Sequence, residues 1–208
     1  MEAKKVSTKL LRRLPAYLNY IKSLPQQTEN ISATKLAKAL GLGDVLVRKD
    51  LAKVSDGGRR KLGYNREDLI RDIEDFLDVN SVTGAVIVDA GKLGQALLDY
   101  PGFEKSGLYI LAGFDVNPAV KKTEAGKPIY PMSRLESFCH GYDVSIGIIT
   151  VPGEHAQQVC DQLIACGIDA IWNFSPVHLI VPENVVVQSE NLAVSLTALR
   201  MRLKRRKN

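Results

Sequence analysis

Short, continuously apolar runs alternate with helix-like stretches over the second part of the chain. They are Ala85–Val88, Leu108–Phe114, Val144–Thr150, Ala170–Asn173 and Val185–Val187. A strand that is apolar throughout has to be covered on both faces, and helices between strands allow parallel pairing. This part of the sequence therefore predicts a parallel sheet with helices on both faces, an α/β domain of the Rossmann-like kind.

The turn after the first of these strands nearly matches GxGxxG, the glycine fingerprint of dinucleotide-binding domains. Its residues are Asp89, Ala90, Gly91, Lys92, Leu93 and Gly94. In that fingerprint the first glycine makes the tight turn, the second admits a diphosphate and the third lets helix and strand approach. Asp115 ends the next strand, 24 residues after Gly91, near the spacing of a carboxylate that binds a ribose. The pattern predicts a dinucleotide or another adenine nucleotide in this crevice.

Asp89 stands where the fingerprint has its first glycine. An L-residue there strains the turn, and its carboxylate opposes a diphosphate, an effect that Lys92 partly offsets. The alternative is a doubly wound domain that keeps its glycines for packing and has lost the ligand.

The first part of the chain reads as helices. An apolar stripe over Lys9–Ser23 contains Pro15, so the first helix is expected to begin near that proline. Ser32 is a suitable cap for a helix over Ala33–Leu40, and Asp44 for one to about Val54, with a glycine-bearing turn between them. This order is typical of a helix-turn-helix.

Charge is unevenly distributed along the chain. Residues 1–66 contain 15 Lys/Arg and 5 Asp/Glu, a balance of +10, whereas residues 67–200 contain 8 and 18, a balance of −10. The last eight residues add 5 positive charges. A basic first part on an acidic body predicts two domains, the first of which faces a polyanion.

Cations gather on the third helix and on the segment after it. Arg48, Lys49 and Lys53 lie opposite the apolar stripe of that helix, where long donors reach base edges and phosphates. Arg59, Arg60 and Lys61 stand between glycines in Ser55–Tyr64, which suits a small basic hairpin, or wing, along a DNA groove. The plainer interpretation is a solvated charged face.

Other functional classes find little support in the residues. No apolar run approaches the roughly 18 residues of a membrane span, and the N-terminus lacks the apolar core of a signal peptide. Cys139, Cys160 and Cys166 form no CxxC pair, which argues against a zinc site and for a reducing cytoplasm. The histidines show neither metal-ligand nor catalytic spacing, so neither a metal nor an enzymatic activity is expected. A helix over Asn191–Lys207 carries leucines on one side and covers either its own sheet or a partner chain.

Taken in order, the motifs resemble the redox-sensing transcriptional repressors of the Rex family over nearly the whole chain. The markers are Arg13-Leu14-Pro15 with Tyr17, Val47-Arg48-Lys49-Asp50-Leu51, Gly63-Tyr64, Gly91-Lys92-Leu93-Gly94, Phe114-Asp115, Thr150-Val151-Pro152 and Asn173-Phe174-Ser175-Pro176-Val177. The resemblance implies a homodimer with an N-terminal winged helix-turn-helix domain (1–80), a Rossmann-like domain (81–188) and a swapped C-terminal helix (189–208). It also implies binding to AT-rich palindromic operators, release by NADH, and sensing of the NADH/NAD+ ratio.

The resemblance also assigns roles to residues. Gly91 and Gly94 would meet the diphosphate and Asp115 the adenosine ribose. Around the cofactor would lie Tyr100 and, nearer the nicotinamide, Thr150, Pro152 and Phe174. The DNA-facing residues would be Arg13, Arg48, Lys49, Arg59, Arg60 and Lys61.

Three departures from the family pattern concern sensing. Asp89 replaces the first motif glycine, Asn191 stands where the family usually has Asp, and Asn19 where it often has a basic residue. An ion pair at the last two positions is one way to lock the NADH-bound form, and here both are amides. The resulting hypothesis is a Rex-like repressor with weakened or altered dinucleotide response. The alternatives are a DNA-binding dimer with a vestigial nucleotide site and, less favoured, an NAD-dependent oxidoreductase.

Overall fold

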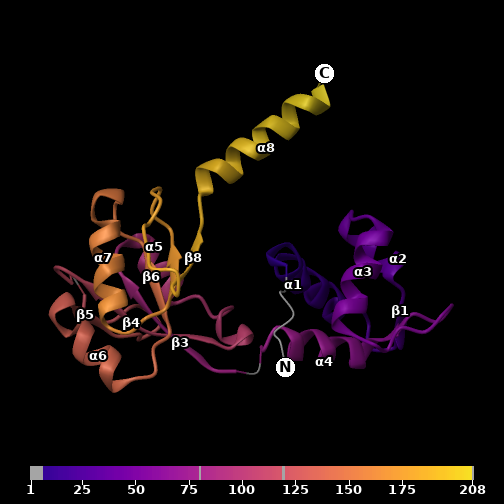
Figure 1. Cartoon of the computed structure of the whole chain (residues 1–208), viewed down its shortest axis with the longest axis horizontal. Coiled ribbons are helices and arrows are strands. Elements are labelled where there is room, and N and C mark those ends of the chain that lie inside the picture. The colour runs from indigo at the N-terminus through magenta and orange to yellow at the C-terminus, as the bar shows by residue number, and fades with distance from the viewer. Residues whose placement is uncertain (1–6, 80, 119, 208) are drawn as a thin grey trace. The chain divides into compact units, whose positions relative to one another are not determined.

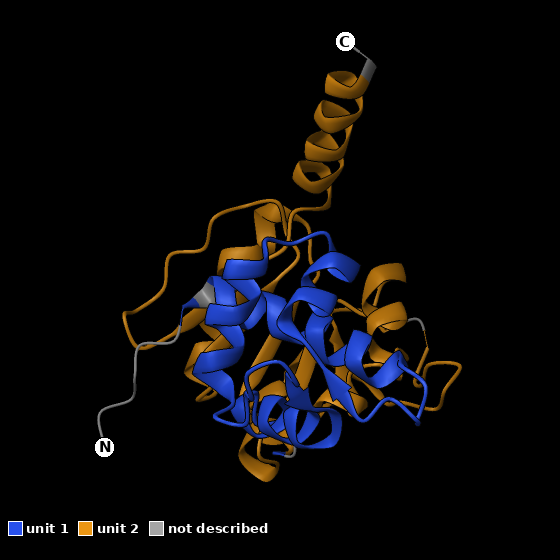
Figure 2. Ribbon diagram, turned by 90° about the vertical axis from the view of Figure 1, so that its right-hand side faces the viewer, with its two compact units in different colours: residues 1–81 blue, residues 82–208 orange. Residues whose placement is uncertain are grey.

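The chain divides into two compact units, Met1–Ser81 and Val82–Asn208. The computed structural model describes residues 7–79, 81–118 and 120–207. Figure 1 labels the helices and strands, and Figure 2 colours the two units separately. Each unit has a hydrophobic core of its own, formed only by residues of that unit.

Four helices and a two-stranded ribbon make up the first unit. In chain order they are α1 (Thr8–Ser23), β1 (Asn30–Ile31), α2 (Ala33–Leu40), α3 (Asp44–Val54), β2 (Tyr64–Asn65) and α4 (Arg66–Phe76). β1 and β2 pair antiparallel, with Ile31 opposite Tyr64. The core comes from one apolar stripe on each helix, including Leu14, Leu36, Leu51 and Leu69. With the segment between α3 and β2 as its wing, this is the winged helix-turn-helix that the sequence predicted.

Two predicted helix starts in this unit are wrong. Helix α1 begins at Thr8, with Pro15 inside it, because the buried stripe on both sides of the proline outweighs the single backbone hydrogen bond that proline cannot make. Helix α3 is capped by Gly43, and Asp44 is already its first residue. The expected cap of α2 is confirmed, since Ser32 Oγ accepts a hydrogen bond from the Lys35 amide at 3.1 Å.

The second unit is a six-stranded parallel sheet in the order β5-β4-β3-β6-β7-β8. The strands are β3 (Thr83–Val88), β4 (Leu108–Asp115), β5 (Ile129–Pro131), β6 (Ile146–Ile149), β7 (Ala170–Asn173) and β8 (Val186–Ser189). The chain leaves β3 toward one edge and returns to β6 on its other side, so the strand order reverses there. Ligands of such sheets bind at the carboxyl ends of the strands beside this reversal.

Helices cover both faces of the sheet. Val86 and Val88 face a core shared with α6 (Leu135–Gly141) and α7 (Gly153–Ala165), whereas Ala85 and Ile87 face the core under α5 (Lys92–Leu98). Short 3₁₀ turns occupy Glu104–Ser106 and Met132–Arg134. The alternation along β3 explains why its sequence is apolar at every position.

The predicted helix at the C-terminus forms as α8 (Leu192–Lys207). Asn191 caps it, accepting a hydrogen bond from the Val194 amide at 3.0 Å. Every side chain from Asn191 to Arg206 is exposed, and Figure 1 shows the helix extending away from the sheet. Among the described residues of its unit, α8 therefore has no packing partner. None of the described helices has the length and apolar character that crossing a membrane requires.

Candidate functional site

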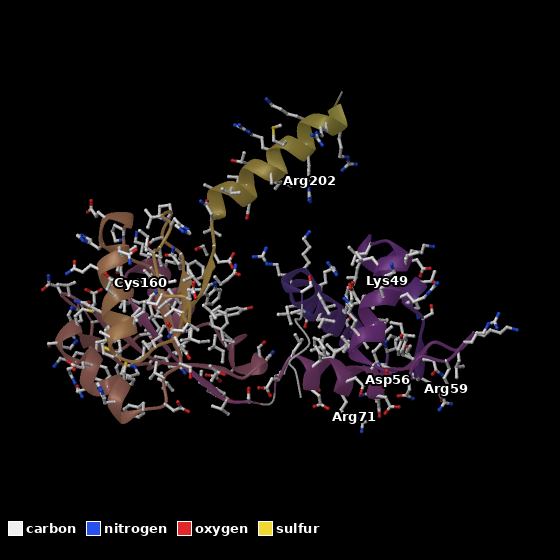
Figure 3. All side chains as sticks on the ribbon, viewed as in Figure 1. Lys49, Asp56, Arg59, Arg71, Cys160 and Arg202 are labelled. Atoms are coloured by element: carbon white, nitrogen blue, oxygen red, sulfur yellow. The ribbon has the colours of Figure 1, made fainter. Side chains whose placement is uncertain are left out.

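Helix α3 presents its cations on the face away from the core. Val47 and Leu51 are buried, whereas Arg48, Lys49 and Lys53 are exposed. Figure 3 labels Lys49 on this helix and Arg59 on the wing, each with its side chain on the outside of the unit. The structure thus gives α3 the exposed basic face of a recognition helix.

Asp44 joins α2 to α3 on this basic surface. Its carboxylate accepts a hydrogen bond from Thr34 Oγ1 at 2.8 Å and pairs with Arg48 Nη2 at 2.6 Å. The pair spans one helical turn, so Arg48 is held along the axis of α3. Sequence reasoning did not assign Asp44 this role.

Arg13 makes its hydrogen bonds inside the first unit. Its Nε and Nη2 donate to the Asp50 carboxylate at 2.7 and 2.8 Å, and the Tyr17 hydroxyl donates to the same carboxylate at 2.8 Å. Asp50 is only 4% exposed, and the bond to it raises the pKa of Arg13. The expected DNA-facing residue therefore clamps α1 to α3, and its assignment to DNA remains a prediction.

The wing is a tight hairpin closed between Arg59 and Gly63. The Arg59 amide donates to the Gly63 carbonyl at 2.8 Å, and the Gly63 amide donates back at 2.9 Å. Lys61 takes a left-handed conformation at the tip, with φ 71°. A groove of about 520 Å³ runs between wing, α2 and α3, lined by Ser32, Ala33, Thr34, Arg48, Gly58, Arg59, Arg60, Lys61, Gly63 and Tyr64. Four of the predicted DNA-facing cations thus share one groove.

In the second unit, Asp89 holds the backbone conformation that the fingerprint glycine normally supplies. Its φ is 78°, and its Oδ1 accepts a hydrogen bond from the Gly91 amide at 2.8 Å. Aspartate tolerates this left-handed conformation because its short side chain can bond the local backbone. The turn therefore keeps its fold at Asp89, but the carboxylate occupies an amide that points to the diphosphate position in intact motifs.

The other predicted residues of the turn build it as the fingerprint requires. A Cβ on Gly94 would lie 2.0 Å from the Asp89 carbonyl oxygen, so only glycine fits there. The Thr150 hydroxyl lies 2.9 and 2.8 Å from the carbonyl oxygens of Val88 and Asp89, which ties β6 to the turn. Lys92 and Leu93 are exposed in the first turn of α5.

Asp115 closes the turn from the neighbouring strand. Its Oδ2 accepts a hydrogen bond from the Ala90 amide at 3.0 Å, and its Oδ1 accepts one from Asn117 at 2.9 Å. With Gly91 bonded to Asp89, two of the three amides between β3 and α5 are engaged by carboxylates of the chain itself, and the Asp89 amide donates to the Phe114 carbonyl at 2.8 Å. A diphosphate that bound either of these two amides would have to displace its carboxylate.

A pocket of about 560 Å³ opens at the carboxyl ends of β3, β4 and β6. It is lined by Val88, Asp89, Asp115, Val116, Met132, Val151, Pro152, His155, Gln158, Val159 and Gln162. Its walls combine apolar side chains, suited to a flat ring, with the Asp115 carboxylate, suited to ribose hydroxyls. Pro152 lines this pocket together with Asp115, whereas Phe174 does not line it, and the predicted nicotinamide contact of Pro152 remains a prediction.

Sequence reasoning missed most of the α7 wall of this pocket. His155, Gln158, Val159 and Gln162 recur at helical spacing directly after Pro152. That spacing was the available signal, because α7 starts at a strand end where ligands bind. His155 also lies 3.5 Å from Glu154, as a surface pair.

Tyr100 and Phe174 belong to a row of aromatic rings outside the lining of that pocket. Tyr100 contacts Phe103, Phe103 contacts Trp172, and Trp172 contacts Phe174, with ring centroids 4.9, 5.5 and 4.7 Å apart. Of these rings, Phe103, Trp172 and Phe174 pack against the core under α5. Ligand contacts of Tyr100 and Phe174 therefore remain predictions. Elsewhere, the described residues contain no group of three or more His, Cys, Asp or Glu arranged to hold a metal ion.

Known proteins match both units of the chain. The CoA binding domain family matches residues 80–177, and the DNA-binding protein N-terminus family matches residues 5–52. The redox-sensing transcriptional repressor Rex of Porphyromonas gingivalis is 43% identical over 202 residues, covering 96% of this chain and 93% of that protein. Its counterpart from Clostridium acetobutylicum is 34% identical, covering 94% and 92%.

Solved structures agree with these relatives. The crystal structure of RSP in complex with β-NAD+ and operator DNA matches with a TM-score of 0.89 at 32% identity, covering 99% of this chain and 95% of that one. The complex of RSP with β-NADH matches with a TM-score of 0.85 at 32% identity, covering 99% and 97%.

A winged helix-turn-helix unit joined to a Rossmann-like unit defines a class of DNA-binding regulator, in which the sheet domain serves as a sensor rather than as an enzyme. Within that class, the chain belongs to the family of redox-sensing transcriptional repressors called Rex.

Proposed function

We propose that this chain is a transcriptional repressor that binds an AT-rich palindromic operator in the cytoplasm as a homodimer and answers to NADH and NAD+. Helix α3 and the wing bind the DNA, and the crevice at Asp89 and Asp115 binds the dinucleotide. Helix α8 supplies the dimer contact, because its leucine face has no partner among the described residues. Two chains would then present two recognition helices to a palindrome.

The groove of the first unit carries the DNA part of this proposal. Arg48 from α3 and Arg59, Arg60 and Lys61 from the wing line a single groove. Four cations that converge from two elements form an electrostatic site for a polyanion, which a merely solvated helix face does not explain.

The dinucleotide part rests on the fit of the crevice. Asp115 and the apolar walls suit an adenosine, and Gly94 lets α5 approach β3. The diphosphate position fits less well, because the Asp89 carboxylate occupies the Gly91 amide. We therefore expect the chain to bind NADH more weakly than a relative with three motif glycines, and to need more NADH for release from DNA.

Operator binding followed by fluorescence anisotropy tests both parts. We expect specific binding to a labelled AT-rich palindrome and a weakened complex for Arg48→Gln, with release by NADH only well above low-micromolar concentrations. Lys105→Gln, on the exposed surface of the other unit, is the matched control and should bind like wild type. Release at low-micromolar NADH would contradict the weakened response, and no response to any dinucleotide would favour a vestigial site.

A further inference from the structure

The hydroxyl of Tyr64 opens into the groove of the first unit without a hydrogen-bond partner among the described residues. Tyr64 is 8% exposed, held by the pairing of β2 with Ile31 and by Gly58 against its ring. A Cβ on Gly58 would lie 2.8 Å from Tyr64 Cζ. Over the described residues, every fully buried side-chain nitrogen or oxygen has a partner, so the unpartnered hydroxyl oxygen has to reach the groove surface. A largely buried tyrosine whose hydroxyl is accessible and has no partner among the described residues is suited to donate to a ligand.

The start of α2 also lines the groove, directly after the residue that pairs with Tyr64. Ser32 Oγ takes the Lys35 amide, which leaves the amides of Ala33 and Thr34 without a hydrogen-bond partner among the described residues. Ser32, Ala33 and Thr34 all line the groove. Free amides at a helix start carry partial positive charge and bind anions.

Arg48 and the wing complete the donor set. Arg48 lines the groove together with Tyr64. Burial raises the pKa of Tyr64, and the Arg48 charge lowers it in part. One nitrogen of Arg48 donates to the Asp44 carboxylate, which also accepts a hydrogen bond from the Thr34 hydroxyl. The remaining donors are two amides, one hydroxyl and the wing cations, a set that matches an anion with several oxygens.

We propose that the Tyr64 hydroxyl and the first amides of α2 bind one backbone phosphate in each operator half-site. This contact fixes the register of α3 and the wing on the duplex and reads no base. The inference rests on the proposed DNA-binding function and deepens it by naming residues that were not among the predicted cations. DNA is favoured over a free anion because the same groove is continuous with α3 and the basic wing.

The test compares Tyr64→Phe with Tyr20→Phe in the full chain. Tyr64→Phe keeps the ring against Gly58 and removes one donor, so operator affinity should fall about tenfold, with an equal fall on unrelated duplex. Its salt dependence should stay that of wild type, because the lost donor is neutral. Tyr20 lies on α1 outside the groove, so Tyr20→Phe should bind like wild type.

Two further measurements identify the phosphate. Ala33→Pro removes one α2 amide at the first helical position, where proline fits, and should also weaken binding several-fold. Operators with single methylphosphonates should lose affinity for wild type at one phosphate per half-site. Tyr64→Phe should lose less affinity at that phosphate, because only the α2 amides still bind it.

Three outcomes would overturn the proposal. Wild-type affinity in Tyr64→Phe, or an unchanged methylphosphonate pattern, would overturn this inference alone. A wild-type chain that binds no duplex would overturn the proposed function with it. Inorganic phosphate that competes with DNA only in wild type would support the assigned site.

Discussion

Asp89 shows how one residue can preserve a fold while changing its chemistry. Its left-handed backbone and its bond to the Gly91 amide reproduce the turn that a glycine would make. The carboxylate nevertheless accepts a hydrogen bond from the Gly91 amide, which we propose as a donor to the diphosphate. The sequence predicted this conflict, but it did not predict that Asp115 would engage the Ala90 amide as well, because that contact joins residues 25 positions apart.

Replacing Asp89 separates charge from turn geometry. Asp89→Gly removes both the charge and the competing acceptor, so NADH should bind about tenfold more tightly. Asp89→Asn keeps the turn and removes only the charge. Its affinity for NADH should lie between that of wild type and that of Asp89→Gly. Isothermal titration calorimetry with NADH and NAD+ measures the effect. An affinity for Asp89→Gly equal to that of wild type would show that the carboxylate does not oppose the ligand.

Tyr17 makes the first unit sensitive to alkaline pH. Burial and the bond to Asp50 raise its pKa from 10.0 to about 12. Because the folded state holds this proton more tightly than the unfolded chain, the associated stability is complete below about pH 10 and is lost as the pH rises toward 12. The urea midpoint of wild type should therefore fall across this range more steeply than that of Tyr17→Phe.

Tyr20→Phe is the matched control for this prediction. It leaves the Asp50 network intact, so its midpoint should follow the wild-type pH dependence. Parallel curves for wild type and Tyr17→Phe would show that Tyr17 does not contribute.

At the scale of elements, the sequence predicts those with strong periodicity and misses those without it. The long apolar strands and the capped helix α2 lie close to their predicted bounds. Strand β5 was not predicted because it has only three residues, Ile129–Pro131, and ends in a proline. Helix α6 was not predicted because its seven residues are too few for an apolar stripe. The start of α1 was misjudged because packing outweighed the local cost of Pro15.

Helix α8 should be needed for self-association but not for the stability of the sheet in its unit. Leu196→Glu with Leu199→Glu places charges on the leucine face, so the dimer should dissociate in sedimentation experiments and operator affinity should drop. The melting temperature of the sheet should barely change, since the described part of α8 packs on no other element. Val194→Glu, on the opposite side of the helix, is the control. A dimer that survives the double substitution would place the interface elsewhere.

The balance of charge changes along the chain inside the first unit, not at the boundary between the two units. The first 66 residues carry a balance of +10, and residues 67–200 a balance of −10. The acidic stretch also contains the proposed dinucleotide site, where backbone amides rather than cations have to bind phosphate. This leaves the groove of the first unit as the main site for polyanions.

DNA affinity should therefore fall steeply with salt. If Arg48, Lys49, Arg59, Arg60 and Lys61 each neutralise a phosphate in both chains of a dimer, log K against log salt should have a slope of about −9. Lys61→Gln removes one contact per chain and should reduce that slope by about two. Filter binding or anisotropy across a salt series measures it. A slope near zero would exclude the basic groove as the DNA site.

The single tryptophan of the chain lies beside the segment that leads into α8. Trp172 lies in the aromatic row between Phe103 and Phe174, and its indole nitrogen lies 3.4 Å from Glu190 Oε1, which also accepts from Gln188. Indole emission shifts with the polarity and hydrogen bonding of its surroundings, so this chain carries an intrinsic optical probe at the root of its last helix. Any rearrangement there becomes visible in the unlabelled protein as a change in emission colour.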